Sequence, residues 1–342
     1  MTTLAFLGDV MLGRLVSAEL GKRRPESFWG STLPVLRAAD AVFVNLECAI
    51  TKCQRPWART PKVFHFRAEP TAIAVLKAAG VRYAGLANNH VLDFETGGLQ
   101  ETLRRLDGAG IAHAGAGCTM TEAMRPALVN VGGLQVGVIA LTDNEPDFAA
   151  RRDRPGVYYT PILDNPDILT PIGDAVRRLR DEGADLVVLS PHWGPNMVLR
   201  PPSEFRRFAA MACGMGVDLV HGHSAHIFQG VERCGDSLIL YDTGDFLDDY
   251  AVDRTLRNDW SFIFLVEVAG RRIERLRMLP VRLGFAQVDL ASGEEFLAIT
   301  RRMLHLCRDL GSEPVETPEG LLLEVGDTAR SRPGYPAVAA AG

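Results

Sequence analysis

Long hydrophobic runs are missing from this sequence. No window of the 342 residues approaches the roughly 20 consecutive apolar residues that a transmembrane helix needs. The amino terminus also lacks the basic head and long apolar core of a secretory signal peptide, since a candidate strand begins almost at the first residue. We therefore expect a cytoplasmic protein without a membrane anchor.

An excess of charge of either sign is missing as well. The chain has 37 Lys and Arg residues and 42 Asp and Glu residues, which gives a net charge of −5, and the two signs are interspersed. This pattern argues against a nucleic-acid partner, which selects for strongly basic surfaces. We expect a small-molecule or peptide substrate instead, and the sequence carries no signal for an oligomeric state.

Cysteine pairs of the C-x-x-C type are also missing. The six cysteines are scattered along the chain, and without an export signal we expect them to be free thiols. Cys48 and Cys53 flank Glu47, and a metal or redox role for them is the less favoured alternative.

Five short apolar runs are present, and each ends in a residue that can bind a metal or transfer a proton. These runs cover residues 4–9, 41–47, 83–90, 186–192 and 218–226. A buried parallel strand is typically a short apolar run bounded by turn signals. Because ligands bind beyond the carboxyl ends of the strands in open α/β sheets, we expect the terminal side chains to converge on one crevice.

The organisation of the chain predicts an α/β protein. Helix ends rich in alanine or glycine precede four of the five runs, so helices and buried strands alternate. We expect one domain over residues 1–250, with the strands and helix of residues 251–327 packed on the same domain and a disordered tail at 328–342. Residues 144–171 are rich in Pro, Asp and Arg and are predicted to form a long surface loop.

The residue types at the strand ends suit a divalent metal. Carboxylate, amide oxygen and imidazole together bind zinc or a transition metal such as manganese or iron. The candidate ligands are Asp9, Glu47, Asn89, His192, His223 and His226. They outnumber the ligands of one tetrahedral ion, so we expect one or two ions, a pair being about 3.5–4 Å apart and bridged by a carboxylate. His90 is left free as a proton donor.

Each candidate also has a structural alternative. Asp9 could cap a turn, Glu47 could be a surface charge and Asn89 could belong to a turn. His221 lies in the strand register, so we interpret it as a core histidine. Asp93 either orients His90 or caps a helix, and the cap is the favoured interpretation.

Five motifs occur in the order found in a known family. They are Gly8-Asp-Val-Met-Leu-Gly-Arg14, Asn45-Leu-Glu47, Ala87-Asn-Asn-His90, His192-Trp-Gly194 and Gly222-His-x-x-His226. Together they resemble the bacterial capsule-synthesis CapA/PgsA family, which is implicated in poly-γ-glutamate biosynthesis and related to calcineurin-like metallophosphoesterases. The resemblance implies a four-layer αββα sandwich and a dinuclear metal centre. It also puts the six candidates at metal-ligand positions and His90 at the proton-donor position.

The sequence departs from the family at Ser224-Ala225, which replaces the middle pair of the usual Gly-His-His-Pro-His, and again at residues 243–246. It departs from the phosphoesterases at the first strand. Met11 stands where their Asp-x-His motif has its histidine, so one metal lacks a ligand. The segment Thr243-Gly-Asp-Phe246 replaces the usual Leu-Gly-Asn-Phe and adds a carboxylate, Asp245. We expect Asp245 either to compensate for the missing ligand or, together with Asp9, to act in acid/base catalysis.

The leading hypothesis is a metal-dependent hydrolase that acts on an amide or γ-glutamyl peptide or a related anionic substrate. The alternatives are a metal-independent acid/base enzyme such as a peptide epimerase, a phosphoesterase, and a non-catalytic assembly factor. Arg14 is a candidate for binding an anionic substrate, with a surface ion pair as its alternative. Trp193 is expected either to line the substrate cleft or to pack in the core.

Overall fold

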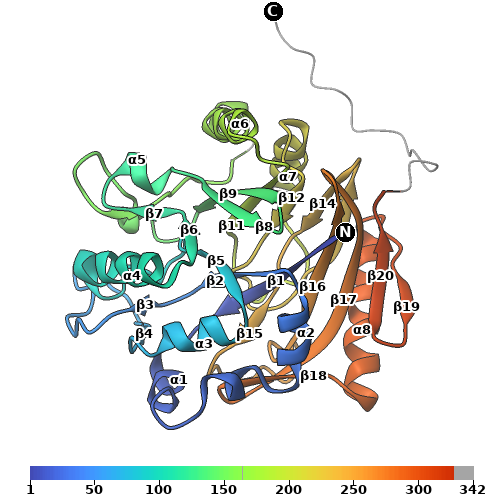
Figure 1. Ribbon diagram of the computed structural model, residues 1–342, viewed down its shortest axis with the longest axis horizontal. Helices are drawn as coiled ribbons and strands as arrows, with labels where there is room; N and C mark the ends of the chain where they lie inside the picture. The colour runs from blue at the N-terminus through green and yellow to red at the C-terminus, as the bar shows by residue number, and fades with distance from the viewer. Residues whose placement is uncertain (164, 327–342) are drawn as a thin grey trace, which may run out of the picture.

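The fold is built around two β-sheets that pack face to face (Figure 1). The computed structural model describes residues 1–163 and 165–326. The larger sheet has the strand order β19-β20-β17-β16-β1-β2-β5-β6, with β15 paired to β1 and β18 paired to β17. The smaller sheet has the order β13-β14-β12-β11-β9-β8. The predicted tail at 328–342 lies outside the described residues.

The strands of the larger sheet are β1 (Thr2–Val10), β2 (Ala41–Leu46), β5 (Val81–Gly85), β6 (Ala112–Ala114), β15 (Asp245–Leu247), β16 (Trp260–Ala269), β17 (Arg272–Gly284), β18 (Gln287–Leu290), β19 (Val315–Thr317) and β20 (Gly320–Glu324). The strands of the smaller sheet are β8 (Ala127–Val131), β9 (Leu134–Thr142), β11 (Leu186–His192), β12 (Leu219–His221), β13 (Val231–Cys234) and β14 (Ser237–Leu240). Two short pairs lie outside the sheets, β3 (Ala49–Ile50) with β4 (Arg67–Ala68) and β7 (Ala116–Gly117) with β10 (Gly156–Val157).

Helices cover the outer faces of both sheets. The helices are α1 (Arg14–Glu19), α2 (Leu33–Ala38), α3 (Ala72–Ala78), α4 (Glu95–Ala109), α5 (Met120–Ala123), α6 (Pro166–Asp181), α7 (Ser203–Gly214) and α8 (Gly293–Asp309), with 3-10 turns η1 (Pro25–Thr32) and η2 (Pro146–Phe148). Within the described residues, no helix is both long enough and apolar enough to cross a membrane.

The alternation of side chains along β1 explains the layers. Ala5 and Leu7 point to one face and belong to a core shared with α1 to α4. Leu4 and Phe6 point to the other face and pack against the smaller sheet. A third core, which includes Leu189 of β11, joins the smaller sheet to α6 and α7. The four layers are therefore helices, sheet, sheet and helices, and the predicted αββα sandwich is confirmed.

The central strands of both sheets are parallel, as predicted. In the larger sheet β1, β2, β5 and β6 run in one direction. In the smaller sheet β9, β11, β12 and β14 are mutually parallel. The carboxyl ends of β1, β2, β5, β11 and β12 consequently meet at one edge of the sandwich, which is where the candidate site lies.

The C-terminal strands extend the larger sheet. β16 pairs antiparallel to β1, with Thr2 opposite Val268 and Phe6 opposite Phe264. β17 and β20 continue the sheet beyond β16, and α8 packs its apolar side, including Met303, into the core between the sheets. Residues 251–326 therefore share a sheet and a core with the N-terminal strands.

The long loop predicted at 144–171 is wrong over its last six residues, 166–171, which are helical. α6 begins at Pro166, where the side chain of Asn165 accepts a hydrogen bond from the backbone N–H of Asp167. Proline is favoured in the first helical turn because that turn has no intrahelical partner for its N–H groups. Pro166, one of the prolines that indicated a loop, therefore marks the beginning of a helix, and the loop ends at Asn165.

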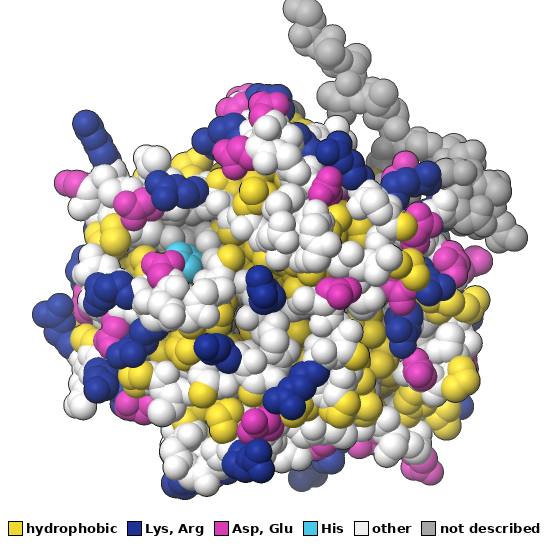
Figure 2. Space-filling model, in the orientation of Figure 1, with side chains coloured by type: hydrophobic (Ala, Val, Ile, Leu, Met, Phe, Trp, Pro, Cys, Tyr) yellow, Lys and Arg dark blue, Asp and Glu magenta, His cyan; other side chains and the backbone are white. Residues whose placement is uncertain are grey.

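Charged side chains of both signs are interspersed over the surface. Figure 2 shows basic and acidic groups alternating across the face in view, with apolar side chains between them. This arrangement agrees with the small net charge of −5.

Candidate metal centre

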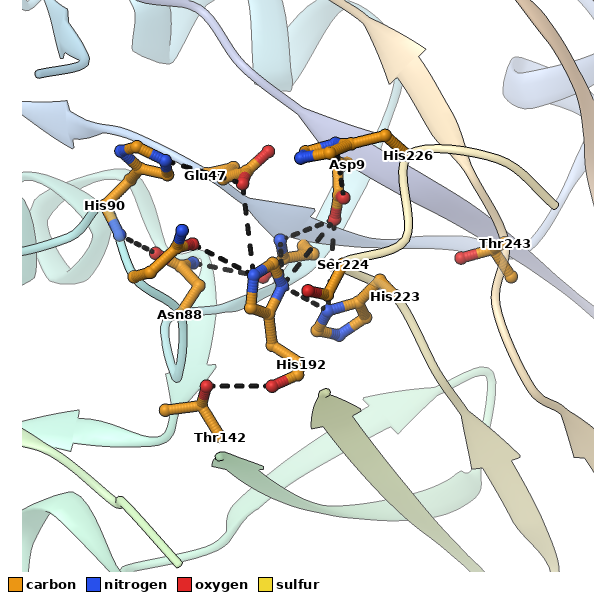
Figure 3. A network of polar contacts seen from close by, with 12 residues as sticks. Asp9, Glu47, Asn88, His90, Thr142, His192, His223, Ser224, His226 and Thr243 are labelled. Carbon is orange, nitrogen blue, oxygen red and sulfur yellow. Dashed lines mark hydrogen bonds and ion pairs between the residues drawn. The ribbon is translucent and has the colours of Figure 1, made fainter. Parts of the chain in front are cut away.

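Side chains from separate strand ends converge on one polar cluster, and Figure 3 shows several of them pointing towards one another. Each residue ends a strand, begins one or lies in the loop that follows it. The cluster contains Asp9 of β1, Glu47 after β2, Asn89 after β5, His192 of β11, His223 and His226 after β12, and Asp245 of β15. Residues far apart along the chain are thereby brought together, since Asp9 and Asp245 are register partners.

The first group of potential ligands surrounds His192. Its Nδ1 atom lies 2.9 Å from Nδ1 of His223, and both nitrogens are 3.9 Å from Oδ1 of Asp9. The other ring nitrogen, Nε2, lies 3.0 Å from Oδ1 of Asn89 and 3.9 Å from Oε1 of Glu47. Asp9, His192 and His223 offer ligand atoms that all lie within 4.8 Å of one another, and this carboxylate and these imidazoles suit a transition metal. Asn89 and Glu47 face the other nitrogen of the His192 ring and do not join this group.

The second group shares Asp9 with the first. Nδ1 of His226 lies 3.6 Å from Oδ2 of Asp9 and 2.8 Å from Oδ1 of Asp245. Ligand-type atoms of Asp9, Glu47, His226 and Asp245 all lie within 4.8 Å of one another. Because Asp9 belongs to both groups, its carboxylate is positioned to bridge two ions.

The carboxylates of the centre carry oxygens that lack a partner. Asp9, Glu47 and Asp245 are fully buried. Within the described part of the chain, Oδ2 of Asp9, Oε1 of Glu47 and Oδ2 of Asp245 have no hydrogen-bond partner. Burying an unpaired charge is costly, so carboxylates of this kind are normally paired or coordinate a metal. The donor set and the unpaired oxygens therefore fit divalent cations.

The electrostatics of the groups agree with this fit. Burial, followed by the nearby charge of Glu47, raises the pKa of Asp9 well above its usual value. Burial likewise raises the pKa values of Glu47 and Asp245. Burial lowers the pKa values of His192 and His223 well below the usual range, so both rings are neutral, which is the form that binds metals.

His226 behaves differently from the other histidines. Burial opposes its protonation, but the carboxylates of Asp245, Glu47 and Asp9 outweigh burial and raise its pKa well above the usual value. Its backbone has a φ of 60°, and that of Ser224 has a φ of 114°. Left-handed conformations are strained for residues other than glycine, and such strain is often found at functional sites.

His90 lies beside the centre rather than inside it. Its Nδ1 atom donates a hydrogen bond of 2.6 Å to Oδ2 of Asp93, and its Nε2 atom lies 3.9 Å from Oε1 of Glu47. The ring of Phe66 stacks on His90 at a centroid distance of 3.8 Å. His90 is therefore held in one orientation, with Nε2 turned towards the carboxylates.

The interpretation of Asp93 as a helix cap is wrong. The residue that caps α4 is Phe94, and no side chain hydrogen-bonds to the cap. The carboxylate of Asp93 instead binds His90 and accepts a 2.6 Å hydrogen bond from the backbone N–H of Phe66. The reason is geometric, because a tight turn between His90 and Asp93 brings the two side chains together.

Comparison with known proteins shows to which family the chain belongs. Residues 3–250 match the sequence profile of the family described as bacterial capsule synthesis protein PGA_cap. The chain belongs to this family. A probable polyglutamine synthesis accessory protein of Mycobacterium tuberculosis is 33% identical over 306 residues, which cover 86% of this chain and 80% of the relative. A PGA biosynthesis protein CapA of Bacillus subtilis is 28% identical over 253 residues, which cover 73% of this chain and 64% of that protein.

Solved structures with a similar chain course are more distant. A hypothetical protein of Thermus thermophilus has a TM-score of 0.47 at 14% identity and covers 82% of this chain and 98% of its own. The calcineurin-like phosphoesterase YfkN of Bacillus subtilis has a TM-score of 0.39 at 13% identity and covers 85% of this chain and 88% of its own. The roles of the site residues follow from the distances given above and from membership of the PGA_cap family.

Asp245 brings a carboxylate to the centre of this PGA_cap protein, whereas Met11 stays outside it. β15 runs parallel to the end of β1, with Asp9 opposite Asp245. This approach requires glycine at position 8, because a Cβ there would lie 1.7 Å from the carbonyl oxygen of Gly244. Met11 is buried in the apolar core, and its sulfur accepts a hydrogen bond from the backbone N–H of Gly13. The register of β15 thus supplies a ligand-type oxygen while the thioether packs elsewhere.

Several supporting residues were missed by the sequence reasoning. Nδ2 of Asn45 donates to Oδ1 of Asp9 at 2.7 Å, and Asn88 donates to Oδ1 of Asn45 at 3.1 Å. The Lys62 side chain, which is only 6% exposed, donates to the carbonyl oxygen of Asn89 at 2.7 Å. Asn45 and Asn88 could have been found because they lie inside the family motifs, whereas Lys62 lies in an irregular segment with no such signal.

Trp193 is not a substrate-binding residue in this fold, and the interpretation of it as a cleft residue is corrected. Its side chain is buried, its ring stacks on Phe205 at 5.0 Å, and its indole N–H donates to the carbonyl oxygen of Tyr241. These contacts place it in the core beneath α7 because its side chain points away from the ligand-bearing loop.

His221 and the cysteines agree with the structural interpretation. Nε2 of His221 donates to the carbonyl oxygen of Leu7 at 2.8 Å, which makes it a hydrogen-bonded core histidine. All six cysteines lie in the described residues and are free. Cys48 is buried, and burial raises the pKa of its thiol to about 12, so it is not a reactive thiolate.

Proposed function

We propose that this PGA_cap protein is a metal-dependent hydrolase that acts on the amide bonds of γ-glutamyl peptides or of a closely related anionic substrate. The observation that carries the proposal is the set of three buried carboxylates with unpaired oxygens beside neutral histidines. The names of the relatives, which refer to polyglutamine synthesis and PGA biosynthesis, supply the substrate class.

The centre would hold two divalent ions, of manganese, zinc or iron. The first ion would be held by Asp9, Glu47, His226 and Asp245, and the second by Asp9, His192 and His223. Asn89 lies at the other ring nitrogen of His192, where it orients the imidazole. Bound ions of this kind lower the pKa of a water molecule and polarise the carbonyl group of a substrate.

His90 would transfer the proton that the reaction requires. Because Nδ1 donates to Asp93, the free nitrogen is Nε2, which faces the centre. Burial lowers the pKa of His90 well below its usual value, so Nε2 of the neutral ring carries a lone pair. Nε2 therefore first takes a proton from the attacking water and then gives it to the leaving amine, and stacking by Phe66 holds the ring in this orientation. Asp93 acts as a positioning residue in this scheme.

The test is an assay of purified protein with and without metal. Metal-stripped and reconstituted samples are incubated with γ-glutamyl peptides, α-linked glutamyl peptides and a phosphodiester, and the metal content of each sample is measured. We expect metal-dependent release of glutamate from the γ-linked peptides. Absence of bound metal after reconstitution, or equal activity with and without metal, would overturn the proposal.

Two variants sharpen this test. His90→Asn should lose activity by about 10²- to 10⁴-fold and keep its metal, since the imidazole only transfers a proton. Asp9→Ala should lose both metal and activity. His305→Asn is the matched control, because His305 is exposed on α8 beside Asp309.

An acid/base enzyme without metal, such as a peptide epimerase, is the second candidate. It is favoured by the direct 2.8 Å contact between His226 and Asp245, which would serve as the acid/base pair. This candidate predicts chelator-insensitive uptake of deuterium from heavy water at the α-carbon of a peptide. The hydrolase predicts no such uptake.

A further inference from the structure

A hollow at the surface contains Arg14, whose guanidinium lies close to Phe66, the residue that stacks on His90. It has a volume of about 340 Å³ and is lined by Arg14, Ser17, Ala18, His65, Arg67 and Glu69. This volume is at the small end of the range for ligand pockets, which suits one amino-acid residue of a substrate. We call it the Arg14 hollow.

The Arg14 hollow is linked to the centre through two aromatic rings. The guanidinium carbon of Arg14 lies 5.7 Å from the ring of Phe66 and 5.9 Å from that of Tyr250. Phe66 stacks on His90, and the hydroxyl of Tyr250 donates to Oε2 of Glu47 at 3.3 Å. Phe66 and Tyr250 are therefore neighbours of both the Arg14 hollow and the centre.

Arg14 has donor groups to spare. Among the described residues its guanidinium forms no hydrogen bond, and its ion pair with Asp249 is long, at 3.4 Å between Nε and Oδ1. About a third of the side chain is exposed. By contrast, Arg67 is engaged by Glu69 at 2.7 Å and by the carbonyl oxygen of Thr51. Of the two arginines that line the hollow, Arg14 is thus the one whose N–H groups, which lie along the edges of the planar guanidinium, form no hydrogen bond with the described residues.

The backbone holds Arg14 in this position. Its φ of 50° is left-handed, and the following residue, Leu15, donates a 2.8 Å hydrogen bond to Oδ2 of Asp249. The strained conformation persists because these contacts fix it, and a pre-set donor loses less entropy on binding. Asp249 thereby fixes the loop while leaving the outer edge of the guanidinium available.

We infer that the Arg14 hollow is the subsite for a free α-carboxylate of a γ-glutamyl chain. Every residue of such a chain carries one α-carboxylate, and the flat guanidinium pairs with a carboxylate through two parallel hydrogen bonds. The rings of Phe64, Phe66 and Tyr250 lie 5.7–5.9 Å from the guanidinium carbon, and about a third of the Arg14 side chain stays exposed. This inference rests on the proposed function for its substrate class, but it concerns binding and not the reaction.

The experiment measures binding by calorimetry on the metal-loaded protein. The His90→Asn background prevents turnover, and a γ-glutamyl oligomer is the ligand. Arg14→Gln should weaken binding by roughly 10- to 100-fold, as expected for loss of hydrogen bonds between charged groups. Arg14→Lys should recover only part of this loss, since lysine lacks the planar fork. Arg82→Gln, which removes an exposed cation at the far end of β5, is the matched control.

Two further ligands separate the sources of affinity. An oligomer whose α-carboxylates are converted to carboxamides should bind weakly, and equally so to the Arg14 protein and the Arg14→Gln variant. Inorganic phosphate should compete weakly, and strong competition would instead mean that the hollow prefers phosphate. The inference is overturned if the protein does not bind the oligomer, if Arg14→Gln binds it within twofold of the parent, or if phosphate is preferred.

The outcomes also separate this inference from the proposed function. In the assay of the otherwise unchanged protein, Arg14→Gln should raise KM with kcat nearly constant. Arg14-dependent binding without hydrolysis would contradict the hydrolase and keep the subsite. Hydrolysis with an unchanged KM in Arg14→Gln would contradict the subsite and keep the hydrolase.

Discussion

Removal of divalent ions should destabilise the folded protein by a predictable amount. Three buried carboxylates share the centre, and each has an oxygen without a partner in the described residues. An ion that binds only the folded chain stabilises it by about 2.7 kcal/mol when its free concentration is 100 times its Kd. Two ions would contribute about 5 kcal/mol.

This free energy converts to a shift in Tm. An unfolding entropy of about 2.1 cal/mol/K per residue gives roughly 0.7 kcal/mol/K for 342 residues. The Tm of the loaded protein should therefore exceed that of the chelated protein by about 8 °C. Asp245→Asn, which removes one ligand-type oxygen from the group of Asp9, Glu47 and His226 only, should show about half of this shift.

The assay is differential scanning calorimetry during a titration of the chelated protein with manganese or zinc. Asp9→Ala serves as the control because it removes the carboxylate that both groups share, so its Tm should not respond to metal. Equal Tm values for the loaded and chelated proteins, or an undiminished shift in Asp9→Ala, would refute the reasoning.

Three further predictions concern residues outside the metal groups. Trp193→Ala should lower the free energy of unfolding by about 3–5 kcal/mol in a urea titration, because it leaves a cavity in the core, and KM should stay constant. A raised KM with little loss of stability would instead show that Trp193 lines the substrate cleft. Asp93→Asn should lower kcat less than His90→Asn does and shift the pH profile of kcat, since it removes only the carboxylate that orients the ring; an unchanged profile would argue for a purely structural role. At Glu101, burial opposes ionisation, but hydrogen bonds from Thr51 and Arg105 outweigh it and lower the pKa to about 2 from 4.5. The ionised Glu101 side chain therefore stabilises the fold above pH 4.5, and this stabilisation is lost as the pH falls towards 2. The urea midpoints of the unchanged protein and Glu101→Gln should differ by a constant amount above pH 4.5, and the difference should shrink between pH 4.5 and pH 2.

The convergence of strand ends was predictable because it follows from a short physical rule. Buried parallel strands leave apolar runs in the sequence, and their carboxyl ends share one edge of a sheet. Asp9, Glu47 and His192 could therefore be grouped before any fold was known. The rule does not determine which side chains complete the cluster, because hydrogen bonds between segments far apart in the sequence leave no local pattern.

Asp93, Lys62 and Trp193 illustrate that limit. Lys62 donates to Asn89, and Asp93 accepts from Phe66, only because the segment of residues 51–66 packs over the loop after β5. Trp193 follows a strand-end histidine in the sequence, but its side chain points into the opposite core. At these positions, the distance between two residues along the sequence therefore did not predict whether their side chains are in contact.

Asp245 was predicted as an extra carboxylate near the site with two alternative roles, and the register of the short strand β15 decides its position. A shift of one residue would turn Asp245 away from Asp9. The small residues Gly8 and Gly244 permit the close approach of the two strands, and no periodicity signals such a contact in advance.

The number of ions at the centre is the most direct test of the account. A crystal of the metal-loaded protein, measured on both sides of the absorption edge of the metal, would give the anomalous signal at each site. The account predicts two peaks, one among Asp9, Glu47, His226 and Asp245 and one beside His192 and His223, with the first peak lost in Asp245→Asn. No anomalous peak among these residues in a crystal grown with excess metal would contradict it.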